Sequence, residues 1–148
     1  MIQIRAPHEF ERDALLTVFL AGSIEEGKAE HWQDKFMQQF SNYNIIFLNP
    51  RRENFSPADL KEQIRWELRA LHKAEIIVMY FDPNTQSPIS LLELGLYASS
   101  EKLFVCCPDG YFRKENVVEV CARYSIDLSH TIEEFYSFCK SEFADYGH

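Results

Sequence analysis

Two glutamates occupy helical positions at which a carboxylate is unusual. At about 100° per residue around a helix axis, Glu93 and Glu67 each fall beside an apolar face. These faces are expected to point inward and consist of Ile89, Leu92 and Leu96 beside Glu93, and of Leu60, Ile64, Leu68 and Leu71 beside Glu67. Cleavage of a glycosidic bond uses one carboxylate as nucleophile and a second acid to protonate the leaving group. The pair therefore favours glycosyl chemistry.

Each glutamate also has a simpler interpretation when it is considered alone. An acidic residue at a helix edge usually reaches solvent or pairs with a neighbouring cation, here Arg65 or Arg69. Glu93 lies near the amino terminus of its expected helix, where the positive end of the helix dipole favours the ionised form that a nucleophile needs. The presence of two such carboxylates favours the catalytic interpretation over the simpler one.

A loop of small residues follows the first apolar run of the chain. Residues 21–28 include Gly22 and Ser23 and join an expected strand to an expected helix. Free backbone amides and a hydroxyl at such a junction could hold a phosphate or a sugar oxygen. Small residues are also ordinary in strand-to-helix turns, so this loop indicates a binding site only through its place in the fold.

Polar residues also follow the next two apolar runs. Asn49 and Arg51 come after the second run, and Asp82 comes after the third. An arginine in this position could pair with an anionic ligand, stack on a base, or form a surface ion pair with Glu53. We include Asn49, Arg51 and Asp82 among the predicted substrate-binding residues.

Strands and helices are expected to alternate along the chain. Apolar runs rich in strand formers predict strands at residues 15–21, 45–48, 76–81 and 103–107, with a weak candidate at 125–126. Apolar spacing of three or four residues predicts helices at residues 28–40, 57–73, from 88, 116–124 and 131–143. Ser56-Pro57 and Ser87-Pro88 are typical of an N-cap followed by proline in the first turn.

This alternation predicts a doubly wound, flavodoxin-like α/β fold. We expect three layers, with helices on both faces of a five-stranded parallel sheet in the order 2-1-3-4-5. Ligands of such sheets bind outside the carboxyl ends of the strands, near the point where the strand order reverses. The two glutamates and the polar loops fall at this edge. The length of 148 residues predicts a single domain over residues 1–148.

The composition excludes several classes of function. Fifteen basic against 23 acidic residues give a net charge of -8, which disfavours binding of a nucleic-acid polymer. Apolar runs are too short to span a membrane, so we expect a cytoplasmic protein. The histidines lack metal-ligand spacing, and neither a metal nor a cofactor is expected. The cysteines are expected to be reduced and packed, namely Cys106, Cys107, Cys121 and Cys139.

Four segments resemble the nucleoside 2-deoxyribosyltransferase-like family. They are Phe19-Leu20-Ala21-Gly22-Ser23, Asn49-Pro50-Arg51-Arg52, Trp66-Glu67 and Ser87-Pro88-Ile89-Ser90-Leu91-Leu92-Glu93-Leu94-Gly95. The resemblance spans roughly residues 17–113, and Glu93-Leu94-Gly95 is its most specific part. It implies that Glu93 is the nucleophile that attacks the anomeric carbon of 2'-deoxyribose. It also gives Glu67 the place of the family's second acid, an aspartate near the departing base.

Two residues depart from the family pattern, one beside the nucleophile and one at the sugar. Phe19 stands where many members have a tyrosine that orients the nucleophile. Ser87 stands where deoxyribosyltransferases acting on nucleosides commonly have an aspartate that binds the sugar 5'-hydroxyl. The related 2'-deoxynucleoside 5'-phosphate N-hydrolases have a serine there and a similar Gly-Ser-Ile loop, so Ser23 and Ser87 could hold a phosphate. Glu25 and Glu26 add negative charge to the same loop, which opposes a phosphate.

The resemblance implies an enzyme that transfers or hydrolyses at the N-glycosidic bond of 2'-deoxynucleosides. The partners would be a deoxynucleoside or deoxynucleotide and a free base. A 5'-monophosphate N-glycosidase and a catalytically silent nucleotide-binding domain are the alternatives. The family also implies a homo-oligomer in which a neighbouring subunit closes the pocket, with Tyr111 or residues 135–146 as candidate contacts.

Overall fold

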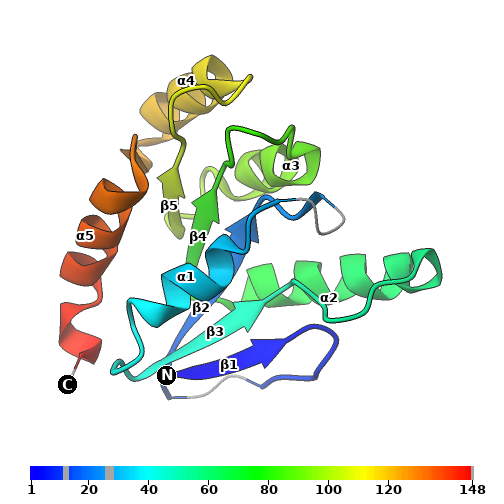
Figure 1. Ribbon diagram of the computed structural model, residues 1–148. Helices are drawn as coiled ribbons and strands as arrows, with labels where there is room; N and C mark the ends of the chain where they lie inside the picture. The colour runs from blue at the N-terminus through cyan, green and yellow to red at the C-terminus, as the bar shows by residue number, and fades with distance from the viewer. Residues whose placement is uncertain (12–13, 26–28, 148) are drawn as a thin grey trace.

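A computed structural model describes residues 1–11, 14–25 and 29–147, and within these ranges the chain forms one parallel sheet with helices on both faces (Figure 1). The strands are β1 (Ile2–Arg5), β2 (Leu16–Gly22), β3 (Ile45–Asn49), β4 (Ile76–Tyr80), β5 (Leu103–Cys106) and β6 (Asp127–Ser129). The α-helices are α1 (Trp32–Gln38), α2 (Leu60–Lys73), α3 (Pro88–Tyr97), α4 (Lys114–Tyr124) and α5 (Ile132–Glu142). Short 3-10 helices, η2 (Pro57–Asp59) and η3 (Ala144–Tyr146), precede α2 and follow α5.

The strand order of the sheet is β1-β3-β2-β4-β5-β6, and every neighbouring pair is parallel. The last five strands of the chain have the predicted order 2-1-3-4-5, which confirms the fold class. β1 is the additional strand, and it pairs with β3 through Ile2 and Ile46. Sequence reasoning missed β1 because it has only four residues, with apolar and polar side chains alternating, and its exposed position needs no continuous apolar run.

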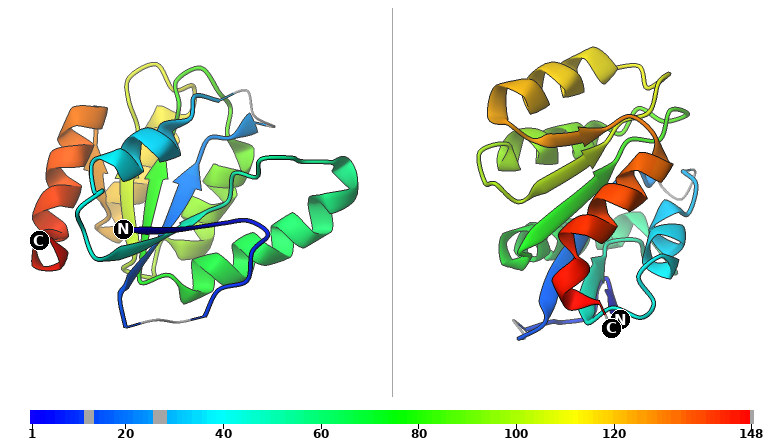
Figure 2. Two further views of the ribbon diagram at one scale, coloured as in Figure 1. Left: turned by 60° about the horizontal axis from the view of Figure 1, so that its bottom comes forward. Right: turned by 90° about the vertical axis from the view of Figure 1, so that its left-hand side faces the viewer.

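The helices form two layers, one on each face of the sheet. α2, α3 and α4 cover one face, and α1 and α5 cover the other (Figures 1 and 2). On the second face, Phe36 of α1 and Phe135 of α5 contact each other, with ring centroids 5.7 Å apart. The predicted inward spacing of α1 is confirmed, because Trp32, Phe36 and Phe40 are all buried. The two glutamates lie on helices of the first face, Glu67 on α2 and Glu93 on α3.

The buried faces of α2 and α3 differ from the predicted ones. Six residues expected in the core are 45–59% exposed: Leu60, Ile64 and Leu68 of α2, and Ile89, Leu92 and Leu96 of α3. The helices bury instead Gln63, Trp66, Ala70 and Leu71 from α2, and Ser90, Glu93 and Leu94 from α3. A helical wheel shows which residues share a face but not which face meets the sheet. The six exposed residues are called the outer apolar stripe below.

The two Ser-Pro signals have different outcomes. Ser56 forms a capping box: its Oγ accepts from Ala58 N at 3.4 Å, and Asp59 Oδ2 accepts from Ser56 N at 3.2 Å. Ser87 is the N-cap residue of α3, but its side chain makes no capping hydrogen bond and its backbone is left-handed, with φ 48°. The prediction of a serine cap is therefore wrong for α3, and another group must satisfy the helix start.

Other element boundaries shift by a few residues. Ser125 takes a left-handed conformation, with φ 55°, and closes α4, so the last strand begins at Asp127 rather than at the predicted 125–126. The described part of the first predicted helix begins at Trp32, and its expected start at Lys28 lies outside the described residues. The four cysteines are free and buried, as predicted.

Gly22 ends β2 in a conformation and a contact that favour glycine. Its φ is +130°, and a Cβ at this position would lie 2.3 Å from the carbonyl oxygen of Tyr80. The same carbonyl oxygen accepts a hydrogen bond from Ser23 N at 3.1 Å. The absence of a side chain at Gly22 therefore lets the loop after β2 lie directly against the end of β4.

We predict that Gly22→Ala lowers the free energy of unfolding by about 2 kcal/mol or more, because backbone strain and the clash with Tyr80 act together. Denaturant unfolding measures this change. The control is Gly95→Ala on α3, where a Cβ meets nothing within 4 Å. This control should raise the free energy of unfolding by ~0.5–1 kcal/mol. A Gly22→Ala protein as stable as the wild type would contradict the turn described here.

Candidate active site

The carboxyl ends of β2, β3 and β4 bring three loops to one edge of the sheet. Gly22 pairs with Tyr80 where β2 and β4 end, and Phe19 of β2 pairs with Leu48 of β3. The strand order reverses between β2 and β4, because the chain goes from β2 outward to β3 and then returns past β2 to β4. Ligands of doubly wound sheets bind at such a point.

Glu67 of α2 and Glu93 of α3 approach each other on the helix-covered face next to this edge. Glu93 is 7% exposed and Glu67 is half-buried. Each lies on its helix between the side packed on the sheet and the outer apolar stripe. The fold thus brings together the two carboxyl groups that the sequence analysis paired, between two apolar surfaces.

Burial makes both carboxyl groups hold their protons more tightly. Loss of water raises the pKa of Glu93 to about 8, and repulsion from Glu67 adds to this shift. Loss of water also raises the pKa of Glu67 to about 7, although the hydrogen bond from Gln63 and the charge of Arg52 lower it. Desolvation of Glu93 therefore opposes the helix dipole, which was expected to favour the ionised carboxylate.

Gln63 holds Glu67 in place from the preceding turn of α2. Its Nε2 donates to Pro50 O at 2.7 Å and to Glu67 Oε1 at 3.3 Å. Its Oε1 accepts from Nε of Arg52, whose guanidinium also pairs with Glu62 at 2.6 Å. The loop after β3 therefore orients Glu67 through Gln63 and brings one positive charge near it.

Phe19 forms part of the apolar core under the two acids. It is 1% exposed, and its ring lies 6.4 Å from that of Trp66, the neighbour of Glu67 on α2. Phe19, Trp66 and Leu94 belong to the same buried cluster between the sheet and the helices. Phe19 adds no hydrogen-bonding group here, and its apolar ring contributes to the low polarity that raises the pKa of both glutamates.

Three buried hydroxyl groups form a cluster at the ends of β2 and β4. Ser23 Oγ lies 2.9 Å from Thr85 Oγ1, Ser87 Oγ lies 2.7 Å from Thr85 Oγ1, and Ser23 and Ser87 are also hydrogen-bonded. Asp82 N donates to Ser23 Oγ at 2.9 Å. The hydroxyls of Ser23 and Ser87 therefore bond to the chain itself.

The carboxylate of Glu25 binds the backbone amides that immediately precede the first helical residue of α3. Glu25 Oε1 accepts from Gln86 N at 2.9 Å and from Ser87 N at 2.6 Å. Tyr111 is buried, and its hydroxyl donates to Gln86 O at 2.6 Å. This burial removes Tyr111 from the candidate subunit contacts. The loop before α3 is thus held by residues from two distant parts of the chain.

Asn49 and Arg51 connect loops within the chain. Asn49 Oδ1 accepts from Arg51 N at 3.0 Å, and Asn49 Nδ2 donates to Gln3 Oε1 at 2.8 Å. Arg51 is buried, and it donates to Gln33 Oε1 at 3.3 Å and to two backbone carbonyls before α1 at 3.3 Å and 3.1 Å. Burial lowers the pKa of Arg51. Its hydrogen bonds to protein acceptors direct it away from the acid pair.

Asp82 shapes the loop that follows β4. Its Oδ1 accepts from Asn84 N at 2.9 Å, and its Oδ2 accepts from Glu30 N at 3.4 Å. The carboxylate therefore links the loops that precede α1 and α3. It supports the edge where Ser23 and Ser87 lie.

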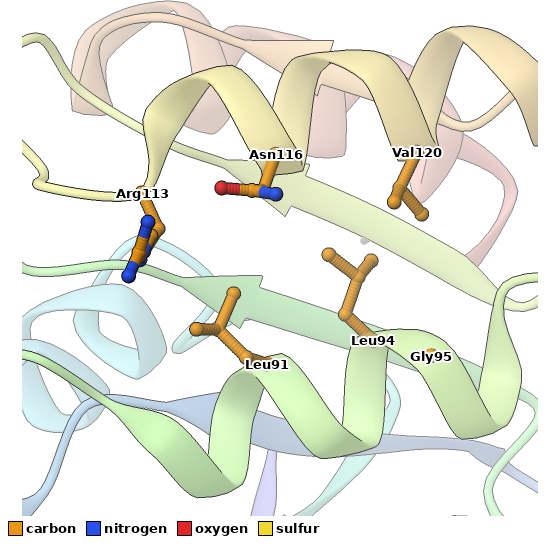
Figure 3. A pocket seen from close by; sticks show the side chains of 6 residues that line it. All are labelled: Leu91, Leu94, Gly95, Arg113, Asn116 and Val120. Carbon is orange, nitrogen blue, oxygen red and sulfur yellow. The ribbon is translucent and has the colours of Figure 1, made fainter.

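Two surface pockets lie beside these elements. One, of about 310 Å³, lies between α3 and α4 and is lined by Leu91, Leu94, Gly95, Arg113, Asn116 and Val120 (Figure 3). The other, of about 660 Å³, is lined by residues 3–9 and 52–54. Neither pocket is lined by Glu67 or Glu93. The raised pKa of two adjacent carboxyl groups therefore marks the candidate site better than pocket size does.

Metal and membrane signals are absent from the described residues. Within residues 1–11, 14–25 and 29–147, no group of three or more His, Cys, Asp or Glu side chains could hold a metal ion. In the same ranges, no helix is both long enough and apolar enough to cross a membrane.

The fold and the acid pair define an α/β protein with paired, proton-holding carboxyl groups at the carboxyl edge of a parallel sheet. A family model described as nucleoside 2-deoxyribosyltransferase like matches residues 16–111, well over half of the chain. The chain therefore belongs to the nucleoside 2-deoxyribosyltransferase-like family, which confirms the resemblance seen in its sequence. A search of curated proteins finds no match. Glu67, Glu93, Ser23 and Ser87 all lie in the matched region.

Sequence reasoning missed Gln63 and Thr85 and gave Glu25 only an unfavourable charge. Gln63 lies four residues before Glu67 on α2, and this spacing is a signal for a side-chain contact. Thr85 has no comparable signal, because its contact with Ser23 depends on the β2–β4 pairing. The contact of Glu25 with the start of α3 spans 61 and 62 residues, so local patterns do not show it.

We predict that the free energy of unfolding falls as pH rises from about 5 to about 8. An unfolded glutamate titrates near ~4.3, so the folded chain, with the pKa of Glu93 at about 8, binds more protons than the unfolded chain in this range. The fall should be on the order of 2–4 kcal/mol, and Glu93→Gln should remove the part that comes from Glu93 and leave the part that comes from Glu67, whose pKa of about 7 is also raised. Denaturant unfolding at several pH values measures the slope.

The matched control for this measurement is Glu119→Gln, which changes an exposed glutamate of α4. It should keep the slope of the wild type. A slope that is the same in wild type and Glu93→Gln would mean that Glu93 is not desolvated in the folded chain.

Proposed function

We propose that this chain cleaves the N-glycosidic bond of 2'-deoxynucleosides and transfers the deoxyribosyl group through a covalent intermediate on Glu93. The observation that carries this proposal is the desolvated pairing of Glu93 with Glu67 inside the region matched to the family. Cleavage with retention needs a carboxylate nucleophile and a second carboxyl group that donates and later accepts a proton. Both are present, on separate helices.

The proposed reaction has two displacement steps. In the first, a carboxylate oxygen of Glu93 bonds to the anomeric carbon, the bond from that carbon to the base breaks, and the base receives the electron pair and a proton from Glu67. In the second, ionised Glu67 takes a proton from the acceptor, which bonds to the anomeric carbon as the Glu93 carboxylate leaves. Two inversions give retention. A free base as acceptor makes the reaction a transfer, and water makes it a hydrolysis.

The raised pKa of Glu67 suits its proposed role as the acid, whereas the raised pKa of Glu93 requires this residue to lose a proton before it acts as the nucleophile. Glu67, with a pKa of about 7, still carries protons near neutral pH and can act as an acid. Glu93, with a pKa of about 8, must lose its proton before it attacks. Positive charge that develops on the sugar in the transition state favours the ionised carboxylate. Activity should therefore depend on two protonation equilibria that belong to the pair.

Phe19 has no hydroxyl group that could orient Glu93, so packing must hold the nucleophile in position. The family's tyrosine would orient the carboxylate, whereas here an apolar ring lies in the core next to Trp66. Glu93 is held by α3 itself, where Ser90 and Leu94 are buried on the side of the helix that packs on the sheet. In this proposal, α3 positions Glu93 in place of the hydrogen bond that a tyrosine would make.

We predict that Glu93→Ala lowers base release from 2'-deoxynucleosides more than ~10³-fold, because the variant cannot form the covalent intermediate. Glu67→Gln should lower it by ~10²–10⁴-fold, since proton transfer to the base is lost. Chromatography of the released base, with and without a second free base, measures hydrolysis and exchange. Glu119→Gln on α4 is the control and should behave as the wild type. Undiminished base release by Glu93→Ala would contradict the proposal.

Two alternatives are separated by the same chromatographic assay. A 5'-monophosphate N-glycosidase is favoured by the hydroxyl cluster of Ser23, Thr85 and Ser87, and it would release base from monophosphates alone. A silent nucleotide-binding domain is favoured by the apolar residue at Phe19, and it would release no base from any nucleoside. The acid pair favours catalysis over silent binding, because an idle pair of buried carboxyl groups only destabilises the fold.

We also propose that a second copy of the chain covers the outer apolar stripe. The stripe exposes apolar side chains on both helices that carry the acids. Monomeric proteins rarely expose contiguous apolar patches of large size. A second copy on the stripe would remove further water from Glu67 and Glu93. This position replaces Tyr111 as the expected subunit contact, because Tyr111 is buried within its own chain.

We predict that Leu96→Arg weakens self-association at least ~100-fold, because it places a charge in the centre of an apolar contact. Leu96 is 56% exposed in the single chain, so the substitution leaves the core intact. Analytical ultracentrifugation over a micromolar range measures the dissociation constant. Tyr124→Arg, at an exposed aromatic residue of α4 outside the stripe, is the control. A wild-type chain that remains a monomer throughout this range would overturn the proposed contact.

A further inference from the structure

Glu25 places a negative charge at the start of the helix that carries the proposed nucleophile. One of its carboxylate oxygens accepts hydrogen bonds from the amides of Gln86 and Ser87, at 2.9 Å and 2.6 Å. Within residues 1–11, 14–25 and 29–147, no lysine or arginine forms an ion pair with Glu25. Backbone amide dipoles therefore stabilise this charge.

Among residues 1–11, 14–25 and 29–147, the side chain bonded to the amides just before α3 is that of Glu25. Pro88 has no amide hydrogen, and the hydroxyl of Ser87 is engaged with Thr85 instead of the helix. Amides at a helix start attract anions, including phosphate groups. In this chain the carboxylate of Glu25 already occupies two such amides, those of Gln86 and Ser87. A phosphate could use the same amides only by displacing Glu25.

The amides that Glu25 binds and the proposed nucleophile belong to one continuous segment of the chain. Ser87 and Glu93 are six residues apart, or about 9 Å along the helix axis. Side chains of a helix lean towards its amino terminus, so Glu93 extends back towards the amides that Glu25 binds. If the base lies towards Glu67 on α2, the rest of the sugar lies along α3. Its 5' end is then directed towards Glu25.

Resting on the function proposed above, we infer that Glu25 is a specificity residue that selects 2'-deoxynucleosides with a free 5'-hydroxyl against their 5'-monophosphates. A hydroxyl group can donate a hydrogen bond to the Glu25 carboxylate. A 5'-phosphate is repelled by this carboxylate and loses the amides that Glu25 occupies. The buried serine and threonine hydroxyls next to Glu25 are bonded to each other and do not offset this repulsion.

The test compares wild type, Glu25→Gln and Glu25→Gly with the four common 2'-deoxynucleosides and their 5'-monophosphates. Glu25→Gln removes the charge and keeps an oxygen that can accept from the same amides. Glu25→Gly also frees the amides and suits the left-handed backbone at this position, where φ is 47°. The matched control is Glu101→Gly, because Glu101 is an exposed glutamate with φ 63° in the turn before β5.

Selectivity is the ratio of kcat/KM for each nucleoside to that for its monophosphate. We expect this ratio to fall about tenfold in Glu25→Gln and about tenfold to a hundredfold in Glu25→Gly, and to stay unchanged in Glu101→Gly. Titration calorimetry on the Glu93→Ala background provides a second readout without turnover. There, removal of Glu25 should strengthen monophosphate binding by similar factors and leave nucleoside binding equal or weaker.

The outcomes separate this inference from the proposed function. Turnover that is lost in Glu93→Ala, with the same selectivity in all Glu25 variants, would overturn the role of Glu25 alone. No turnover, together with stronger monophosphate binding after removal of Glu25, would support the role of Glu25 and overturn the proposed catalysis. A wild type that binds or turns over monophosphates better than nucleosides would also overturn the role of Glu25.

Discussion

Burial of the Glu93 carboxyl group beside Glu67 is the constraint on which the arrangement of α2 and α3 depends. An ionised carboxylate loses much of its hydration there, and a second carboxylate nearby makes the charged form less favourable still. The packing of Phe19 and Trp66 keeps the region apolar, and Gln63 is a hydrogen-bonding partner of Glu67. Such a placement reduces stability at alkaline pH and has a functional explanation in a reaction that needs both a nucleophile and an acid.

The edge of the sheet is organised to hold the start of α3 in one position. Gly22 lets the end of β2 lie against Tyr80, and this contact places Ser23 among the hydroxyls of the loop before α3. Glu25 of the same β2 loop then binds the two amides that immediately precede α3. Because Glu93 is carried by α3, the sheet, the loop and the proposed nucleophile form a continuous set of contacts. The residues predicted to bind substrate thereby have structural roles at this edge.

The fold was predictable because long apolar runs and apolar spacing determine most of its elements. The order of the last five strands of the chain is the flavodoxin-like order common among doubly wound folds, whereas β1 is too short and too polar to be recognised from local pattern. The outward direction of Leu92 was not predictable, since a wheel does not tell which of two adjoining faces meets the sheet. The pairing of Glu67 with Glu93 was accessible, but the Glu25 contact depends on loops that meet only in the folded chain.

Peptide mass spectrometry after brief incubation with a 2'-deoxynucleoside and acid quenching can detect the proposed covalent bond between Glu93 and the sugar. We expect the peptide containing Glu93 to gain the mass of one deoxyribosyl group, and the adduct to disappear when excess free base is added. An adduct on Glu67, or rapid base release with inversion at the anomeric carbon and no adduct on the enzyme, would overturn the proposed role of Glu93.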